Sequence, residues 1–396
     1  MGRKYRTSTK VVLTLLVVLV LLALAGCQSG PPDYTYAPPE DLDDGLEVGT
    51  IDEVGIDFNL IGTAVDRIRE GDFKAVHSLL VFKEGKLVVE EYFSGYRFSW
   101  EGSGYRGEWI EWDADEHHCS MSLTKSYVSA IVSIAIAQGF INSVHDSIFD
   151  YLPDYQRFAK DGKEDITIEH LVTMTSGLEW NEWNSKSGTK NSIMNLYSCS
   201  DQVRCILDVP PKHEPGTRFT YSGGNMVLLA QIVKYATGME MDEFAGIHLY
   251  EPMGIDDLPL WVRFDSGVLD AAGGSLHTPR EMMKFGVTYL NDGVWDGQQV
   301  IDPEWVALSA TPYRNNTGIR VPGVGGGRKD YGYTWWIHRT RHNGKKIDAF
   351  YAGGWGGQRI IVIPDLEAVV VFTGGTYTAN TATFAVLDKY ILPAIE

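Results

Sequence analysis

The sequence contains few cysteines, a deficit of basic residues, and none of several common catalytic motifs. Only four of its 396 residues are cysteine, and their spacings match no zinc site. Lysine and arginine total 34 against 52 aspartates and glutamates, which gives a formal charge of −18. No basic stripe with interleaved aromatics offsets this charge, so nucleic acid is not an expected partner. The Gly-x-Ser-x-Gly, His-Glu-x-x-His and Walker glycine patterns are also absent, and no metal or cofactor is expected.

The first 26 residues have the layout of a signal peptide. A basic start leads into an apolar run over 11–22, which is shorter than the roughly 20 residues that a membrane-spanning helix needs. Leu-Ala-Gly-Cys at 24–27 resembles a bacterial lipoprotein cleavage site. This predicts an exported protein whose lipidated first residue, Cys27, anchors it to the cell envelope, at the outer membrane if the cell has one. An uncleaved anchor helix is the alternative. Cleavage removes four basic residues and no acid, which leaves a charge of about −22.

Three cysteines then remain, Cys119, Cys199 and Cys205. An oxidising compartment favours a disulfide between Cys199 and Cys205, with free thiols as the alternative, and leaves Cys119 over. Residues 27–50 are rich in Pro, Gly, Asp and Tyr, which predicts a flexible tether. Residues 51–396 show no second linker and no repeat, so we expect one folded domain there.

The order of elements predicts an α+β fold of two lobes. Strand–turn–strand patterns occur near both ends, over 78–93 and 359–373. Helical patterns dominate between them, over 126–140, 168–174, 225–236 and 279–290, and one precedes the first hairpin over 60–69. We therefore expect the terminal strands to share an antiparallel sheet flanked by helices, over about 51–125 and 325–396. A mainly helical lobe over about 140–300 would be inserted between, with a cleft where the lobes meet.

The strongest chemical signal is Ser122-Leu123-Thr124-Lys125 at the start of an apolar helix. Lys125 lies one turn after Ser122 and therefore on the same face. Backbone N–H groups and the positive end of the helix dipole lie near the serine. A serine hydroxyl needs a base to become a nucleophile, and a lysine removed from water gives up its proton more readily. The pattern predicts that Ser122 is a nucleophile activated by Lys125, and a capping serine with a surface lysine is the alternative.

A second Ser-x-x-Lys match shows how weak the motif is alone. Ser187-Gly188-Thr189-Lys190 lies in a loop rich in Asn, Ser and Gly, with no helix behind it. We interpret it as solvated surface.

Three further segments are found at ordered positions: Thr-Ser-Gly within 165–180, Pro-Gly-Thr-x-Phe-x-Tyr-Ser-Gly within 215–225, and Gly-Gly-Trp-Gly-Gly-Gln at 353–358. With Ser122 and Lys125, and with Ala-Ala-Gly-Gly-Ser at 271–275, they resemble the serine β-lactamase, penicillin-binding protein and esterase family from about residue 75 onward. The resemblance implies the two-lobed fold and a covalent acyl-enzyme.

The same resemblance assigns roles to residues outside the Ser122 helix. Tyr221 would face Ser122 and Lys125 and relay the proton, and either Lys125 or Tyr221 could be the primary base. A tyrosine that only packs is the alternative. Trp355-Gly356-Gly357 fills the third motif position, and the backbone N–H groups of Gln358 and Ser122 would form the oxyanion hole.

Two positions depart from typical β-lactamases. Gly223 stands where they carry Asn, and Trp355 stands where they carry the cation or histidine that binds the lactam carboxylate. These residues are closer to the esterase and short-amide-hydrolase branches, including enzymes similar to 6-aminohexanoate-dimer hydrolase. Trp180, Glu182 and Trp183 are candidates for the cleft lining, with ordinary packing as the alternative for the tryptophans.

Three functions remain open from the sequence. The leading hypothesis is a serine hydrolase that forms an acyl-enzyme on an ester or small amide. The second keeps the mechanism but acts on a β-lactam or a D-amino-acid peptide of the cell wall, which an envelope location favours. The third is a non-catalytic binding lipoprotein.

Overall fold

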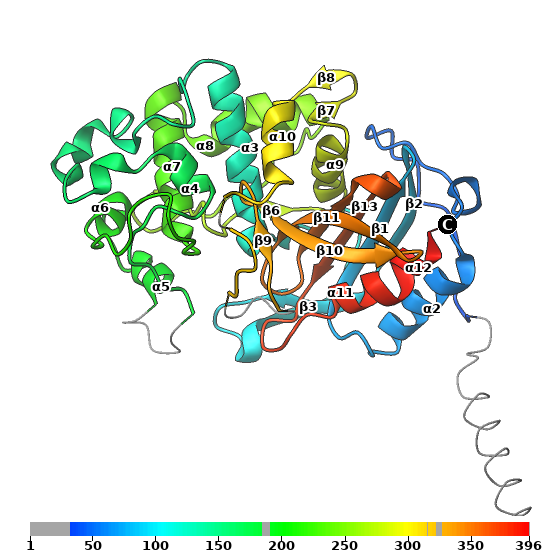
Figure 1. Cartoon of the computed structure of the whole chain (residues 1–396). Helices are drawn as coiled ribbons and strands as arrows, with labels where there is room; N and C mark the ends of the chain where they lie inside the picture. Colours follow the sequence, from blue (N-terminus) through cyan, green and yellow to red (C-terminus); the bar gives the residue numbers. More distant parts are fainter. Residues whose placement is uncertain (1–31, 184–190, 315, 322–326, 396) are drawn as a thin grey trace, which may run out of the picture.

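The computed structural model describes residues 32–183, 191–314, 316–321 and 327–395, and its centre is a seven-stranded antiparallel sheet (Figure 1). The strand order is β2-β1-β13-β12-β11-β10-β9. The strands are β1 (Val76–Lys83), β2 (Lys86–Tyr92), β9 (Asp330–Tyr331), β10 (Trp336–His342), β11 (Lys345–Gly353), β12 (Arg359–Ile363) and β13 (Ala368–Gly374). Because β1 pairs with β13, strands from the two ends of the chain share one sheet. The predicted α+β fold is confirmed.

The central strands are buried on both faces. Every residue of β1 and of β13 is buried, which explains their continuous apolar sequences. The turn between β1 and β2 places Glu84 and Gly85 at φ 49° and 85°, the left-handed values that favour a tight hairpin. Helix α9 (Pro279–Leu290) packs on β12 and β13. Figure 1 shows α2 (Phe58–Arg69), α11 (Thr383–Val386) and α12 (Leu392–Ala394) on the other side of the sheet.

The second lobe is built around α3 (Thr124–Ala137) and α7 (Gly223–Thr237), which pack against each other. Twelve of the fourteen residues of α3 are buried, as expected for a helix that is apolar on all sides. The hydroxyl of Ser222 caps α7 by accepting from the backbone N–H of Asn225, and Gly238 ends the helix in the left-handed conformation. Around this pair lie α4 (Ile168–Val172), α5 (Ser192–Leu196), α6 (Gln202–Leu207), α8 (Met241–Ala245) and α10 (Pro303–Ser309). The helix α9, which falls within the range expected for the helical lobe, lies on the sheet instead.

The expectation of a flexible tether is wrong for residues 32–50. Tyr34 and Leu46 are buried, and the Tyr36 hydroxyl donates to the backbone carbonyl of Val88 over 2.8 Å. The backbone N–H of Leu87 donates to Glu47, so this segment pairs with β2 at the edge of the sheet. An edge strand such as β2 has unpaired backbone N–H and C=O groups to which another segment can bond. Burial of the apolar side chains of residues 32–50 adds a favourable hydrophobic contribution. Residues 27–31, including the predicted lipidation site, lie outside the described residues.

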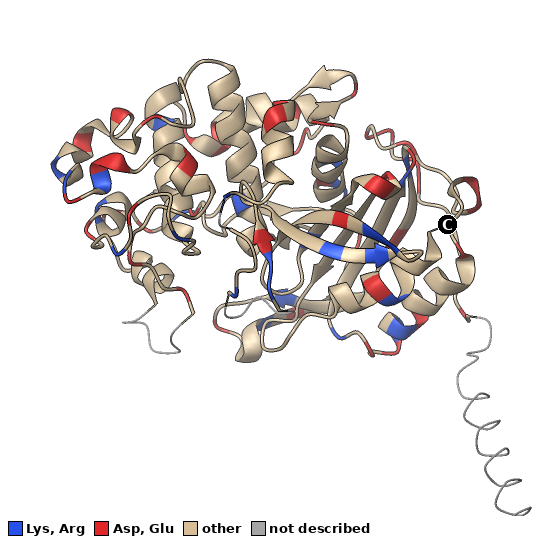
Figure 2. Ribbon diagram, in the orientation of Figure 1, with Lys and Arg blue, Asp and Glu red and all other residues tan. Residues whose placement is uncertain are grey.

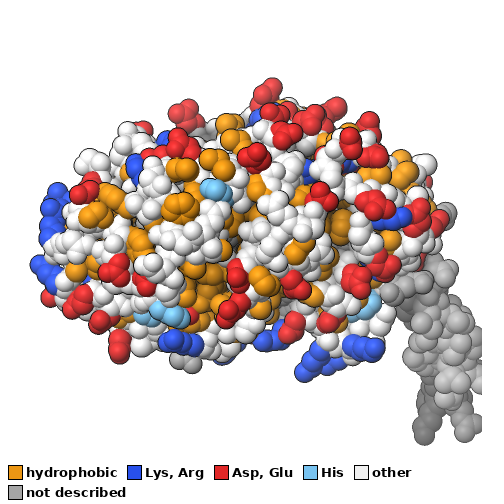
Figure 3. All heavy atoms as spheres, turned by 90° about the horizontal axis from the view of Figure 1, so that it is seen from above, with side chains coloured by type: hydrophobic (Ala, Val, Ile, Leu, Met, Phe, Trp, Pro, Cys, Tyr) orange, Lys and Arg blue, Asp and Glu red, His pale blue; other side chains and the backbone are white. Residues whose placement is uncertain are grey.

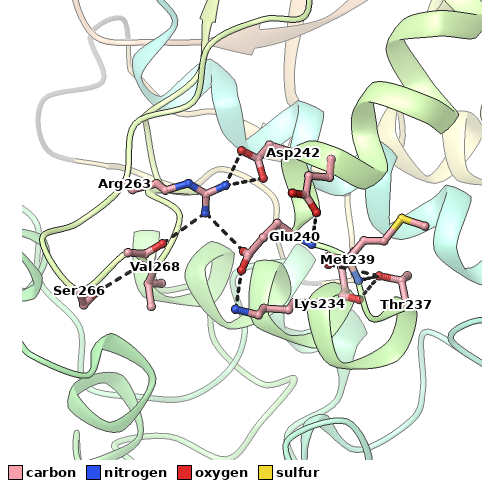
Figure 4. Close-up of polar contacts among 11 residues, drawn as sticks. Lys234, Thr237, Met239, Glu240, Asp242, Arg263, Ser266 and Val268 are labelled. Atoms are coloured by element: carbon pink, nitrogen blue, oxygen red, sulfur yellow. Dashed lines mark hydrogen bonds and ion pairs between the residues drawn. The ribbon is translucent and has the colours of Figure 1, made fainter.

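A surface ion network holds the loop that follows α8. Figure 4 shows the guanidinium of Arg263 between two acids, with Nη2 2.6 Å from Asp242 and Nη1 3.4 Å from Glu240. Lys234 pairs with Glu240 from the end of α7. The loop that carries Arg263 continues to Ala272, which lies in the candidate active site. The network therefore ties that part of the site to α7 and α8.

Short strand pairs and a disulfide complete the fold. They are β3 (Ser94–Phe98) with β4 (Arg106–Glu111), β5 (His118–Cys119) with β6 (Leu276–His277), and β7 (Val294–Trp295) with β8 (Gln298–Gln299). Cys199 and Cys205 form a disulfide, the pairing favoured by the sequence, and Cys119 is free.

Acidic residues are distributed around the whole molecule (Figure 2), and Figure 3 shows them over one entire face among hydrophobic and neutral side chains. No helix within the described residues is long and apolar enough to cross a membrane.

Candidate active site

Ser122 lies in a tight turn that leads directly into α3. The turn is a 3₁₀ helix over Met121–Leu123, and it follows β5. The backbone N–H of Ser120 donates to the backbone carbonyl of Ser275 over 2.9 Å, which holds the turn against the start of β6. Met121 has a φ of 52°, a left-handed conformation that is costly for a residue with a side chain. Ser122 itself is partly exposed, whereas Met121 and Leu123 are buried, so the hydroxyl lies at an accessible point of an otherwise buried turn.

Lys125 is brought to Ser122 by the first turn of α3. Its side chain is 2% exposed, and Nζ lies 3.2 Å from Ser122 Oγ. Nζ also donates to the backbone carbonyl of Ala272 over 2.7 Å. No carboxylate lies within ion-pair distance of Lys125 among the described residues. Ser122 Oγ and the Ala272 carbonyl are thus the hydrogen-bond partners of this amine among the described residues.

Tyr221 lies beside the lysine at the start of α7. Lys125 Nζ is 4.9 Å from the centroid of the Tyr221 ring. The ring is held between Trp336, stacked at 5.8 Å, and Trp183, at 5.7 Å. No hydrogen bond of the Tyr221 hydroxyl occurs within the described part of the chain. The ring is thus fixed by packing, and the hydroxyl has no protein partner there that would compete with a substrate.

The third motif forms a glycine turn next to the nucleophile. Gly354 approaches so closely that a Cβ there would overlap the carbonyl oxygen of Ser120. Gly356 and Gly357 have φ values of 93° and 115°, which only glycine adopts readily. The Gln358 side chain is buried, donates to the Gly374 carbonyl over 2.6 Å and accepts from its N–H over 3.1 Å.

These two hydrogen bonds anchor the glycine turn to β13. The Gln358 backbone N–H has no acceptor among the described residues, which leaves it available to a ligand.

The space beside Gly223 is filled by other groups. A Cβ at residue 223 would lie 2.8 Å from Ala272 Cβ, 2.8 Å from Ile193 Cδ1 and 2.9 Å from Glu182 Oε1. Glu182 Oε1 accepts from the backbone N–H of Gly223 and from Trp180 Nε1, the latter over 2.8 Å. A carboxylate at the start of α7 therefore occupies the region into which a side chain at 223 would extend.

The two candidate tryptophans occupy different places. Trp180 is buried, and its ring lies where a Cβ at Gly224 would be, only 2.6 Å from that position. It packs on α7, which matches the alternative of ordinary packing. Trp183 is 38% exposed and contacts Tyr221, so it lies at the entrance to the site.

Two polar groups near the site carried no signal in the sequence. Asp270 is buried; its carboxylate accepts from the Tyr197 hydroxyl over 2.7 Å and from the backbone N–H of Ala272 over 3.1 Å. Burial raises the pKa of Asp270. Because Asp270 positions Ala272, it supports the carbonyl that holds Lys125. A lone aspartate among small residues gives no indication of this role in a sequence.

The second group is a buried chain of hydrogen bonds beneath the nucleophile. Ser120 Oγ lies 2.8 Å from Nδ1 of His277, whose Nε2 lies 3.1 Å from the Tyr250 hydroxyl. Ser120, His277 and Tyr250 are all at most 1% exposed. A Ser–His pair is a common catalytic unit, but this one is closed to substrate and serves to hold the turn that carries Ser122.

The described residues contain no group of three or more His, Cys, Asp or Glu side chains that could hold a metal ion. The second Ser-x-x-Lys match, at 187–190, lies outside the part of the chain that the structure describes.

Comparisons with known proteins identify the family and the fold. The family model described as Beta-lactamase matches residues 72–386. A curated relative named "Putative D-alanyl-D-alanine carboxypeptidase", from Salmonella agona, is 24% identical over 220 residues, which are 53% of this chain and 49% of the relative. "Protein flp" of Staphylococcus aureus is 24% identical over 196 residues, 48% of this chain and 36% of that protein. The chain thus spans about half the length, or less, of the curated relatives it matches.

Among solved structures, a protein titled "Putative 6-aminohexanoate-dimer hydrolase from Bacillus anthracis" superposes with a TM-score of 0.63 at 20% identity. The match covers 91% of this chain and 88% of that one. A family VIII carboxylesterase gives a TM-score of 0.63 at 17% identity, covering 84% of this chain and 96% of the other. At these identities the superpositions establish the fold alone.

Proposed function

The chain belongs to the β-lactamase family, as its motifs predict, and on that premise we propose that it is a serine hydrolase acting on an ester or small amide through an acyl-enzyme at Ser122. The observation that carries the proposal is the buried contact between Lys125 and Ser122, with Nζ 3.2 Å from Oγ. Members of this family are hydrolases, and the site has the base, nucleophile and free N–H donor that such a reaction needs.

The proposed reaction has two stages. Ser122 Oγ bonds to the substrate carbonyl carbon while its proton moves to Lys125 Nζ. The bond to the alcohol or amine then breaks, and the leaving group takes up a proton that Lys125 or Tyr221 supplies. Water attacks the acyl carbon in the second stage, a proton returns to Ser122 Oγ, and the acid is released.

The negative charge on the carbonyl oxygen is greatest in the tetrahedral intermediates. The backbone N–H groups of Ser122 and Gln358 are the proposed donors to this oxygen, and one such donor is typically worth about 3 kcal/mol. The glycine turn before Gln358 lets the backbone approach the substrate without obstruction from side chains.

The charge distribution supports an ester or small amide over a β-lactam. Residue 355 is a tryptophan and not a basic residue that could bind the lactam carboxylate, and Gly223 has no side-chain amide. A second candidate is a peptidase that acts on D-alanyl peptides. It is favoured by the name of the curated relatives, "Putative D-alanyl-D-alanine carboxypeptidase". The third hypothesis, a non-catalytic binding lipoprotein, predicts no turnover of any of these substrates.

The test compares wild-type protein with Ser122→Ala on p-nitrophenyl acetate, p-nitrophenyl butyrate, nitrocefin and a D-alanyl-D-alanine peptide. Ser122→Ala should lower ester turnover on the order of 10⁴-fold or more. Ser187→Ala, in the second Ser-x-x-Lys match, is the matched control and should keep wild-type rates. A protein mass increased by one butyryl group, after mixing with the butyrate ester, would identify the acyl-enzyme. Equal rates in wild type and Ser122→Ala would end the proposal.

We also propose that the chain is exported and lipid-anchored through Cys27. The basic start, the apolar run over 11–22 and Leu-Ala-Gly-Cys at 24–27 support this proposal. Expression of the full chain with Cys27→Ser should release the protein from the membrane fraction and abolish labelling with radioactive palmitate. A variant that remains in the membrane fraction would contradict lipid attachment at this residue.

A further inference from the structure

A cluster of aromatic rings joins the β3–β4 hairpin to both sides of the candidate active site. We call it the aromatic bridge. Its six members are Phe98, Trp100, Tyr105, Tyr197, Trp355 and Tyr377. Figure 1 shows β3 below the sheet and α5, which precedes Tyr197, in the helical lobe, both along the lower edge of the view.

Most rings of the bridge contact each other edge to face, and Phe98 and Tyr105 are stacked 6.0 Å apart. The Trp355 ring centroid lies 4.8 Å from that of Tyr105 and 5.1 Å from that of Tyr377. Phe98 lies 4.9 Å from Tyr377 and 4.8 Å from Trp100. These are the distances and orientations at which aromatic pairs attract. The bridge is therefore a fixed surface and not a set of independent side chains.

Each end of the bridge is bonded to a component of the proposed catalytic site. Trp100 reaches Tyr197, with ring centroids 6.2 Å apart, and the Tyr197 hydroxyl donates to Asp270. Asp270 in turn accepts from the N–H of Ala272, whose carbonyl holds Lys125.

At the other end, Trp355 belongs to the glycine turn that packs against the nucleophile turn and contains Gln358. The bridge is thus connected to Lys125 through Asp270 and Ala272. It is connected to the proposed oxyanion donor, Gln358, through the glycine turn.

The bridge exposes apolar area with no cation over its rings among the described residues. Trp100 is 54% exposed, and Trp355 and Tyr197 are each 38% exposed. No lysine or arginine lies over a bridge ring among the described residues; Arg106, on the same hairpin, stacks on Tyr96 instead. Tyr105 is held at a φ of 63°, a conformation that a tyrosine adopts only under constraint. Contiguous exposed rings of this kind usually contact a ligand or a partner.

From this arrangement we propose that the aromatic bridge binds an aromatic ring of the substrate, so that the preferred substrates are aryl or arylalkyl esters or amides. The inference rests on the proposed hydrolase function and names its substrate class. A ring that stacks on Trp100 or Trp355 gains aromatic contact and apolar burial, whereas a charged D-amino-acid terminus would find no partner in the bridge.

The hairpin offers a matched pair of variants. Trp100 belongs to the bridge, whereas Trp109, equally exposed at 57%, contacts Tyr96 outside it. We expect Trp100→Ala to lower kcat/KM for methyl phenylacetate about tenfold, as for the loss of one aromatic pair, and to leave methyl acetate, which carries no ring, within twofold. Trp109→Ala should leave both esters unchanged. Comparing the effect of Trp100→Ala on benzyl acetate and on ethyl acetate tests whether the bridge binds a ring on the alcohol side of the ester instead.

Two results would overturn the proposal. One is an equal effect of Trp100→Ala and Trp109→Ala on ring-bearing esters of both kinds. The other is an equal loss on methyl acetate and methyl phenylacetate in Trp100→Ala, which would indicate general damage.

Binding to the inactive Ser122→Ala variant separates the bridge from the catalytic proposal. Methyl phenylacetate should quench tryptophan fluorescence with a Kd about tenfold lower than in the double variant that adds Trp100→Ala, and methyl acetate should bind both equally. If the wild type hydrolyses no ester but this difference is found, the binding site stands and the hydrolase proposal fails. If the Kd values are equal, the aromatic bridge is not the binding site, whatever the catalytic result.

Discussion

Adding a single methyl group at Gly223 should impair catalysis through the position of Lys125. A Cβ there would lie 2.8 Å from both Ala272 Cβ and Ile193 Cδ1 and 2.9 Å from Glu182 Oε1, all closer than carbon or oxygen atoms approach without displacement. Ile193 can move its terminal methyl. Ala272 cannot yield without shifting the backbone carbonyl that lies 2.7 Å from Lys125 Nζ.

The magnitudes follow from two opposing effects on stability and one on catalysis. Overpacking costs about 1–3 kcal/mol, and replacing a helical glycine with alanine returns about 0.5–1 kcal/mol, so Gly223→Ala should lower the free energy of unfolding by up to about 2.5 kcal/mol. A hydrogen bond between uncharged groups is worth about 0.5–1.5 kcal/mol, so misplacing the Ala272 carbonyl should lower kcat/KM for p-nitrophenyl butyrate roughly 2- to 12-fold.

Gly224→Ala is the matched control for this variant. It lies in the same turn of α7, and its Cβ would lie 2.6 Å from the Trp180 ring, which has no contact with Lys125. Urea denaturation should show both variants destabilised, while only Gly223→Ala loses turnover beyond its unfolded fraction. Gly223→Asn should also fail to gain nitrocefin hydrolysis, because its amide would have to displace Glu182. A Gly223→Ala protein with wild-type kcat/KM would refute the reasoning.

Three further outcomes are expected. Lys125→Met should reduce ester turnover by about 10²- to 10⁴-fold without lowering the free energy of unfolding, because it removes a buried amine that has no ion pair; activity within tenfold of wild type would contradict the role of the lysine. Cys199→Ser should lower the free energy of unfolding by about 2 kcal/mol, which is the loop-closure entropy that the short Cys199–Cys205 disulfide removes from the unfolded chain. Dithiothreitol should then have no additional effect on urea denaturation of this variant. Burial lowers the pKa of His77 to about 3 from its ordinary 6.5, so the unfolded chain binds a proton more readily than the folded one between these values. Stability from this group is complete above pH 6.5 and falls with decreasing pH, by up to about 1.4 kcal/mol per unit; urea denaturation at pH 7.5, 5.5 and 4.5 should show a shallower decline for His77→Gln.

The parts of the fold that are encoded locally could be predicted from the sequence. The strands near both ends have continuous apolar runs around Gly- or Pro-containing turns, and their burial on both faces explains those runs. Ser122 and Lys125 are one helical turn apart, so their contact follows from helix geometry once the helix is recognised. The helix predicted over 126–140 begins earlier, at Thr124, and ends at Ala137, because end positions depend on hydrogen bonds that a pattern does not show.

The parts that depend on distant segments could not be predicted. Asp270 and Tyr197 are 73 residues apart in the sequence, and only the folded chain shows that one positions Ala272 and the other joins the aromatic bridge. The β3–β4 hairpin has glycines and charges among its aromatics, so its sequence does not alternate cleanly between apolar and polar residues. Residues 32–50 have the composition of a linker, and a few apolar side chains together with the open edge of β2 were enough to fold them against the sheet.

The packed segment along β2 also determines how far the hydrolase domain could stand from a membrane. An extended tether over residues 27–50 would reach about 80 Å, since a chain spans at most about 3.5 Å per residue. With residues 32–50 bound to the sheet, at most about 20 Å of chain separates Cys27 from the folded body. Because residues 32–34 lie on α2, a lipid on Cys27 would hold the domain close to the bilayer surface with α2 turned toward the headgroups, and the domain could not move far from the membrane.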